Sequence, residues 1–143
     1  MALHGYADEH GGVFPAGGGT PEASLGLLFP TYANPNLLRG KTVPEEAVRR
    51  VLEGGGRLGP ETCGWHYVEG LRKTDDGRLA LCWDKAGLGH NGERLPDGGH
   101  YVIRVGMSID HIPGELWADF RREQQELRAN LGPGRVLVEP DDE

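Results

Sequence analysis

The side chains best suited to chemistry lie in one glycine-rich stretch, residues 82–100, with the sequence CWDKAGLGHNGERLPDGGH. Three of them, His90, Asp97 and His100, belong to the residue types that bind metal ions. Imidazole suits zinc and other transition metals, whereas carboxylate oxygens suit calcium. A metal-binding or acid–base site in this stretch is therefore one hypothesis for function.

The spacing of these side chains favours a structural loop. The histidines lack the i, i+4 spacing of a helical zinc site, and a glycine-rich loop can direct its side chains into water. Asp, Asn and Gly also satisfy backbone groups in turns. We therefore expect no catalytic residue and no cofactor. His90, Asp97 and His100 remain the candidate ligands if a metal binds, and calcium in a loose oxygen site is the ion kept open.

No other segment has the pattern of a catalytic or phosphate-binding site. Ser24 and Ser108 lie in no nucleophile elbow, the strained strand-to-helix turn that exposes a catalytic serine. The glycine triplets at 17–19 and 54–56 lack the Gly-Lys-Ser/Thr ending of a phosphate loop. The carboxylates at 75–76 are explained by turn chemistry. The residues therefore predict a protein that is not an enzyme.

Composition limits the partners and the size of the core. The 143 residues suit one domain, and they include 24 glycines and 10 prolines, about double the usual share. A net charge of -7 without a basic cluster argues against nucleic-acid binding. Because no apolar run reaches about 18 residues, we expect no membrane contact by this chain. A single small core with long loops is predicted.

The hydrophobic pattern predicts an α+β fold. Helical spacing or helix start and stop signals favour four helices, and aromatic-rich segments separated by turn residues favour four strands of an antiparallel sheet. The predicted helices are 3–9, 22–32, 42–53 and 113–130, and the predicted strands are 62–68, 79–83, 100–105 and 108–112. The first helix is expected to be the end of a longer one, with Leu3, Tyr6 and Ala7 packed on the sheet and the apolar stripe of the last helix nearby. That stripe is predicted to consist of Leu116, Trp117, Phe120 and Leu127, with a solvated charged face around residues 121–126. Turns are expected at 34–36 and, between the last two strands, at 106–107. Residues 136–138 are expected to add an edge strand before a disordered acidic tail, 139–143.

Four aromatic residues fall on the predicted strands, at Trp65, Tyr67, Trp83 and Tyr101. Aromatic side chains can form a stacking surface for bases or sugars. In an acidic chain, cross-strand and core packing is the better interpretation. We therefore expect these rings to build the core.

The two cysteines, Cys63 and Cys82, leave two readings open. If the first two strands pair around the turn at 75–77, the cysteines occupy nearly mirrored positions, and a bulge would bring them within bonding range. A disulfide closing a loop of this length is worth about 3 kcal/mol. The other reading is two reduced thiols buried in the core.

The order of several motifs resembles the head of type IV pilin-like proteins of the type II secretion pseudopilin class, in particular its planctomycete-type members. The segments that carry the resemblance are YADEHGGVFP at 6–15, LGLLFPTY at 25–32, WHYVEGL at 65–71, and LCWDK at 81–85 followed by His90. Two departures stand out. This chain has Gly106-Met107-Ser108-Ile109 where the family closes its signature with Asp-Gly-His-Val, and the helix at 44–53 replaces a Cys-Pro segment.

The resemblance implies a non-enzymatic structural subunit whose head presents a surface in a short filament. Its partners would be other pilin-like subunits and the secretion machinery. In the family a leader and an apolar helix precede the head and anchor it in the inner membrane, on the periplasmic side. If the chain is complete as given, the expected compartment is instead the cytoplasm. Without that helix, the chain is expected to be a monomer or weak dimer.

Overall fold

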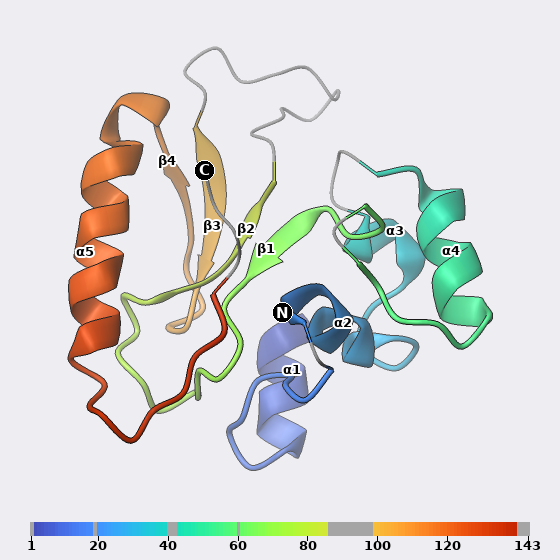
Figure 1. Cartoon of the computed structure of the whole chain (residues 1–143), viewed down its shortest axis with the longest axis horizontal. Helices are drawn as coiled ribbons and strands as arrows, with labels where there is room; N and C mark the ends of the chain where they lie inside the picture. Colours follow the sequence, from blue (N-terminus) through green and yellow to red (C-terminus); the bar gives the residue numbers. More distant parts are fainter. Residues whose placement is uncertain (1, 19, 40–42, 60, 86–98, 140–143) are drawn as a thin grey trace.

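The computed structural model describes residues 2–18, 20–39, 43–59, 61–85 and 99–139. Within these ranges the chain forms a sheet with helices on both sides, which confirms the predicted α+β class (Figure 1). The helices are α1 Ala2–Glu9, α2 Pro21–Leu25, α3 Pro35–Leu38, α4 Glu45–Glu53 and α5 Trp117–Ala129. The strands are β1 Trp65–Tyr67, β2 Ala80–Asp84, β3 His100–Arg104 and β4 Ile109–Ile112. Two short 3₁₀ helices, η1 Gly26–Leu28 and η2 Gly114–Leu116, complete the list.

The four strands form an antiparallel sheet in the order β1-β2-β3-β4. A tight turn joins β3 to β4, as predicted, with the Met107 amide donating to Arg104 O at 3.0 Å. Met107 itself has a φ of 71°, a left-handed conformation that is uncommon outside glycine. The register between β2 and β3 shifts between Ala80 and Cys82, which marks a β-bulge.

Strand β2 is buried along its whole length, because each face of the sheet is covered. Cys82 and Ile103 lie towards α1, α2 and α3 on one face. Ala80 and Trp83 lie towards α5 on the other face. Figure 1 shows α5 on one side of the sheet and the other four helices opposite. The prediction that the stripe of the last helix lies near α1 is therefore wrong, because the two helices pack on opposite faces of the sheet.

Helix α1 is joined to the core by buried side chains. Leu3 and Ala7 are buried, as predicted. The buried His4 ring donates from Nε2 to Val105 O at 2.9 Å, just after β3. Tyr6 is partly buried against the core, and its ring also stacks on His10 and meets Tyr32 edge-on. These contacts hold α1 to the sheet and to the loop that follows η1.

The short helices on the α1 side differ most from the prediction. The single helix expected at 22–32 is α2 followed by η1, because Phe29 is extended ahead of Pro30, and the residue before a proline disfavours helix. The turn expected at 34–36 instead begins α3, whose N-cap Asn34 accepts from the Leu37 amide at 2.9 Å. A side-chain cap followed by proline at the first position stabilises such a short helix.

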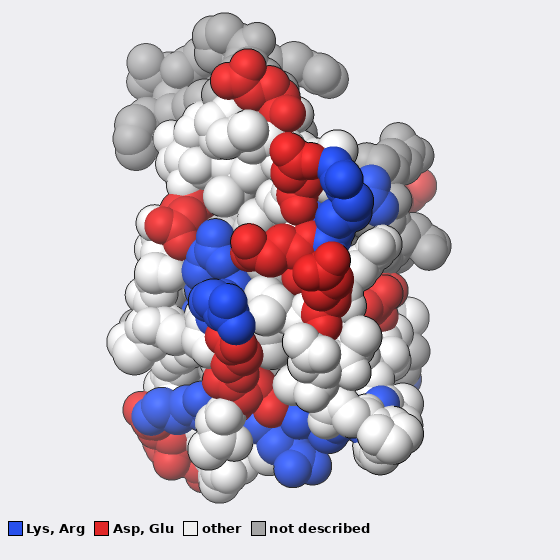
Figure 2. Space-filling model, turned by 90° about the vertical axis from the view of Figure 1, so that its left-hand side faces the viewer, with Lys and Arg blue, Asp and Glu red and all other residues white. Residues whose placement is uncertain are grey.

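Helix α5 carries the buried stripe Phe120, Gln124 and Leu127. Leu116, which we expected on this stripe, belongs to η2 and is half exposed. On the side of the molecule that carries α5, acidic and basic side chains are interspersed (Figure 2). Arg122, for example, forms an ion pair with Asp119 one turn earlier. The outer face of α5 is thus the solvated helix face that the charge pattern predicted.

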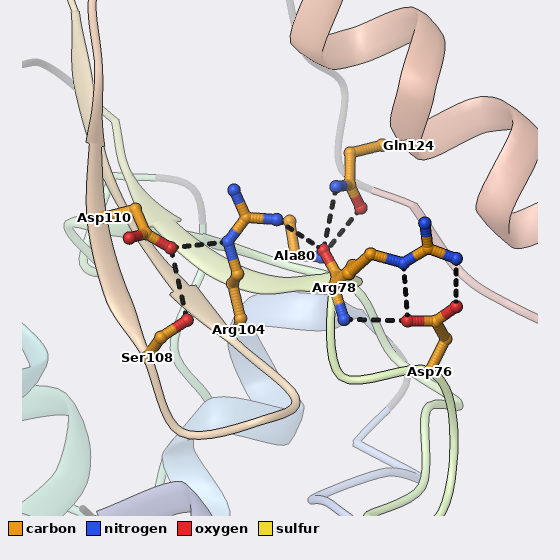
Figure 3. Close-up of polar contacts among 7 residues, drawn as sticks. All are labelled: Asp76, Arg78, Ala80, Arg104, Ser108, Asp110 and Gln124. Carbon is orange, nitrogen blue, oxygen red and sulfur yellow. Dashed lines mark hydrogen bonds and ion pairs between the residues drawn. The ribbon is translucent and has the colours of Figure 1, made fainter.

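The amide of Gln124 fastens α5 to the start of β2 (Figure 3). Its Oε1 accepts from the Ala80 amide at 2.7 Å, and its Nε2 donates to Arg78 O at 3.1 Å. Arg104 from β3 donates to the same carbonyl at 2.6 Å and pairs with Asp110 of β4 at 2.6 Å. The side chain of Gln124 therefore satisfies backbone groups beside the bulge, where the strand ladder is irregular.

The C-terminal segment returns to the edge beyond β1. Val138 and Glu69 exchange two backbone hydrogen bonds, of 2.9 and 3.0 Å, so the expected edge strand is only an isolated bridge. Arg135 donates two hydrogen bonds of 2.7 Å to the Asp75 carboxylate, which lowers the pKa of Asp75. Of the predicted disordered tail, Glu139 forms an ion pair with Arg128, and residues 140–143 lie outside the described residues.

In the ranges that the structure describes, none of the helices is long and apolar enough to cross a membrane.

Replacing Gln124 with alanine is expected to destabilise the fold by about 1–3 kcal/mol, because the buried Ala80 amide loses its acceptor. Urea unfolding followed by circular dichroism measures this change. Gln125→Ala is the matched control, since Gln125 is exposed on the same helix and its loss is expected to change the free energy of unfolding by less than about 0.5 kcal/mol. Equal unfolding midpoints for the two variants would contradict this role of Gln124.

Candidate functional site

The first candidate site lies where the residue 82–100 stretch meets the sheet. His100 opens β3, and its Nδ1 lies 2.8 Å from Asp84 O and 3.1 Å from Asp84 Oδ1. The Asp84 carboxylate is buried and also accepts from the Tyr101 amide at 3.1 Å. Because both neighbours of Nδ1 are acceptors, Nδ1 carries the proton. The ring is therefore held in one orientation by the end of β2.

The other predicted metal ligands, His90 and Asp97, lie outside the described residues. Among the residues that are described, no group of three or more His, Cys, Asp or Glu side chains is arranged to hold a metal ion. His100 is thus brought together with Asp84, a neighbour that the metal hypothesis did not include. A metal site at this loop stays a hypothesis.

The His100 ring also packs into an aromatic cluster under α5. It lies 4.4 Å from Trp117, measured between ring centroids, and Trp117 lies 5.1 Å from Phe120 and 6.2 Å from Trp83. The indole Nε1 atoms of Trp83 and Trp117 are buried without a hydrogen-bond partner, and each such group costs about 1–3 kcal/mol. Apolar packing between α5 and the sheet has to outweigh that cost.

Two of the four strand aromatics are buried in the core, and the other two are partly buried. Tyr67 and Trp83 are buried, and the Tyr67 hydroxyl donates to Pro15 O at 2.6 Å. Trp65 is partly buried, and its Nε1 donates to Leu37 O at 2.9 Å. Tyr101 lies beside His111 of β4. Core and cross-strand packing is therefore the correct interpretation for Tyr67 and Trp83.

The second candidate site is an apolar cavity of about 410 Å³ on the other face of the sheet. Its walls come from the first turn of α1, from α2, η1 and α3, and from β1 to β4. The residues that line it include Leu3, Leu28, Leu38, Trp65 and Ile103. Ligand sites in proteins occupy about 300–1,000 Å³ and are mostly apolar. By size and lining, this cavity is the larger binding-site candidate.

This cavity is not predictable from the sequence pattern, because part of its wall comes from a helix that was not expected. Leu37 and Leu38 line it from α3, where a turn was expected. The pattern Asn34-Pro35 followed by two leucines is the signal that was available, since it combines a helix cap with proline at the first position. Which strand residues face the cavity also depends on the bulge in β2.

The two thiols are free and buried in the structure. Register places Tyr67, not Cys63, opposite Cys82, so the mirrored arrangement that a disulfide required is wrong. Cys63 precedes β1, where its thiol meets Trp65 O at 3.7 Å. Burial raises the pKa of Cys63 to about 11 and the pKa of Cys82 further above its usual range. Both groups are therefore neutral thiols at physiological pH.

Comparison of the chain with protein-family models, with curated proteins and with solved structures finds no match in any of the three.

Alkylation with iodoacetamide at pH 8 is expected to be very slow for the folded protein, because the thiolate is the reactive form. Under denaturing, non-reducing conditions, mass spectrometry is expected to show two alkyl groups per chain. The folded protein is compared with the same sample in urea. An unfolded chain that takes up no alkyl group would mean that Cys63 and Cys82 are joined by a disulfide.

Proposed function

We propose that this chain is the head domain of a pseudopilin-like structural subunit, which presents its surface in a short filament of a type II secretion or type IV pilus-like system. The observation that supports this function best is the attachment of α1. Leu3 and Ala7 are buried in the core, and His4 bonds to the backbone after β3. A head that is carried by an N-terminal helix needs such a rigid joint.

Further contacts hold the C-terminal end of α1. The Gly12 amide donates to Ala7 O at 2.8 Å, which closes the helix. The Lys73 amide in turn donates to Gly12 O at 2.7 Å, and the Lys73 ammonium pairs with Asp8. Both ends of α1 are thus tied to segments that follow the strands. A displacement of the helix would move the head with it.

The proposal implies the partners and the compartment. The subunit would assemble with other pilin-like subunits and with the secretion machinery, and its head would lie on the periplasmic side of the inner membrane. Contacts between heads would use exposed side chains such as Leu27 and Met107. No catalytic group and no cofactor are part of this function.

A small metal-binding protein or enzyme that uses His90, Asp97 and His100 is the second candidate. One observation favours it, namely the Nδ1 contact of His100 with the Asp84 carboxylate. In metal sites a carboxylate commonly holds one ring nitrogen of a ligating histidine while the other binds the metal. Packing of His100 on Trp117 accounts for the same geometry without a metal, which is why we rank this function second.

Crosslinking in native cell envelopes tests the filament function. A short amine-reactive crosslinker is added to intact envelopes, and products that contain this chain are isolated with an antibody and identified by mass spectrometry. Multimers of this chain, or its adducts with other pilin-like subunits, are expected. The same treatment after detergent solubilisation is the control. Recovery of the protein only as an uncrosslinked cytosolic monomer would contradict the proposal.

The chain on its own is expected to be a monomer or a weak dimer at micromolar concentration. In pilin-like filaments the long apolar helix supplies most of the contact between subunits, and heads alone make small interfaces. Light scattering coupled to size exclusion measures the mass. A stable large oligomer would contradict this expectation.

Zinc, nickel and calcium are each expected to leave the melting temperature within about 2 °C of its value in chelator, because the structural role needs no ion. A ligand that binds the folded state at 100 times its Kd stabilises by about 2.7 kcal/mol, a shift of several degrees for a domain of this size. His100→Ala is compared in parallel. A large, saturable rise for one metal that His100→Ala abolishes would establish the second candidate instead.

A further inference from the structure

The apolar cavity next to β1 to β4 has the lining of a site for hydrocarbon. Its walls are aliphatic side chains, the Trp65 ring and the Cys82 thiol. The Trp65 indole N–H is already bonded to Leu37 O, and burial keeps the Cys82 thiol neutral by raising its pKa. A bound water needs two to four polar partners. The cavity therefore offers its occupant almost no hydrogen bond.

The cavity has buried walls and a more exposed mouth. Its inner walls, including Leu3, Leu25 and Leu28, are at most 5% exposed. Only two of its lining residues are well exposed, Leu37 at 48% and Ile109 at 58%. The cavity thus has buried walls and an exposed apolar rim, and it is open to solvent at that rim. A flexible alkyl chain can lie along such walls.

The cavity is larger than a site that holds a single aromatic ring. A dry apolar cavity of about 150 Å³ is enough to hold benzene, and this cavity measures about 410 Å³. Each buried methylene of a ligand adds hydrophobic free energy in proportion to its area. Because the rim opens to solvent, a polar head group would stay in water while the apolar part is buried.

We propose that this cavity binds the alkyl tail of a single-chain amphiphile of the fatty-acid type. Leu37 of α3 and Ile109 of β4 form its mouth, and Trp65 and Cys82 lie along its wall. This inference does not depend on the filament function, because it uses only the lining and the volume of the cavity.

Quenching of tryptophan fluorescence by 12-bromododecanoic acid, below its critical micelle concentration, tests the proposal. Trp65 lines the cavity, whereas Trp83 and Trp117 lie on the other face of the sheet. Saturable quenching is expected, with reversal by unbrominated dodecanoic acid. The quenching is expected to disappear in Trp65→Phe and to persist in Trp117→Phe. Absence of quenching in the wild type, or equal quenching in Trp65→Phe, would overturn the proposal.

A charged side chain introduced at the mouth distinguishes binding in this cavity from non-specific adsorption of the amphiphile to the protein surface. Leu37→Glu is expected to weaken binding at least tenfold, because a carboxylate would lie where the tail enters. Leu116→Glu is the matched control, since Leu116 is 51% exposed and belongs to η2, outside the cavity lining. Circular dichroism verifies that both variants are folded, and Ile109→Glu is a second mouth variant. Equal affinities for all variants would refute the proposal. A stable dimer, measured by light scattering, that buries the mouth would refute it as well.

Discussion

The structure depends on the complete burial of β2. All five residues of this strand are buried, and side chains of a strand project alternately to both faces of the sheet. Each face therefore needs its own apolar layer. Helix α5 supplies one layer, and α1 to α3 supply the other (Figure 1). Burial of one large aliphatic or aromatic side chain is worth about 1.5–3 kcal/mol, so neither layer can be removed without exposing β2.

The two layers are built differently. Helix α5 is one continuous element, and the buried Gln124 ties it to backbone groups around the bulge (Figure 3). The opposite layer consists of short helices, with Asn34 capping α3 and Thr20 capping α2. Short segments cannot interlock along a sheet as one long helix can. The cavity of about 410 Å³ lies within that segmented layer.

Local signals were sufficient to predict the strands, the β3–β4 turn and the two longer helices, α4 and α5. Each is marked by features close in sequence, such as the glycines at 54–56 after α4 or the aromatic residues of β1 and β2. The pairing register was not predictable in this way. A bulge between Ala80 and Cys82 changes which residues face each layer, and Gln124, which bonds to backbone groups beside it, is distant in sequence.

The same limit applies to the candidate sites. Residue types alone marked His100 as a candidate metal ligand, but they did not predict that its Nδ1 contacts Asp84, sixteen residues earlier. For Cys63 and Cys82 the sequence left two readings open, because no residue near either cysteine marks the register that places Tyr67 opposite Cys82. The apolar cavity had no motif at all, since it is formed by residues spread from Ala2 to Ile109.

In the proposed function α1 and the sheet would have to move as one rigid body, because a head carried by an N-terminal helix requires this. Native-state hydrogen exchange followed by NMR tests it most directly. If α1 opens only when the whole domain unfolds, the amides of residues 6–9 exchange within about tenfold of the rates in β2. Exchange of these amides near the rate of an unfolded peptide, while β2 stays protected, would contradict the account.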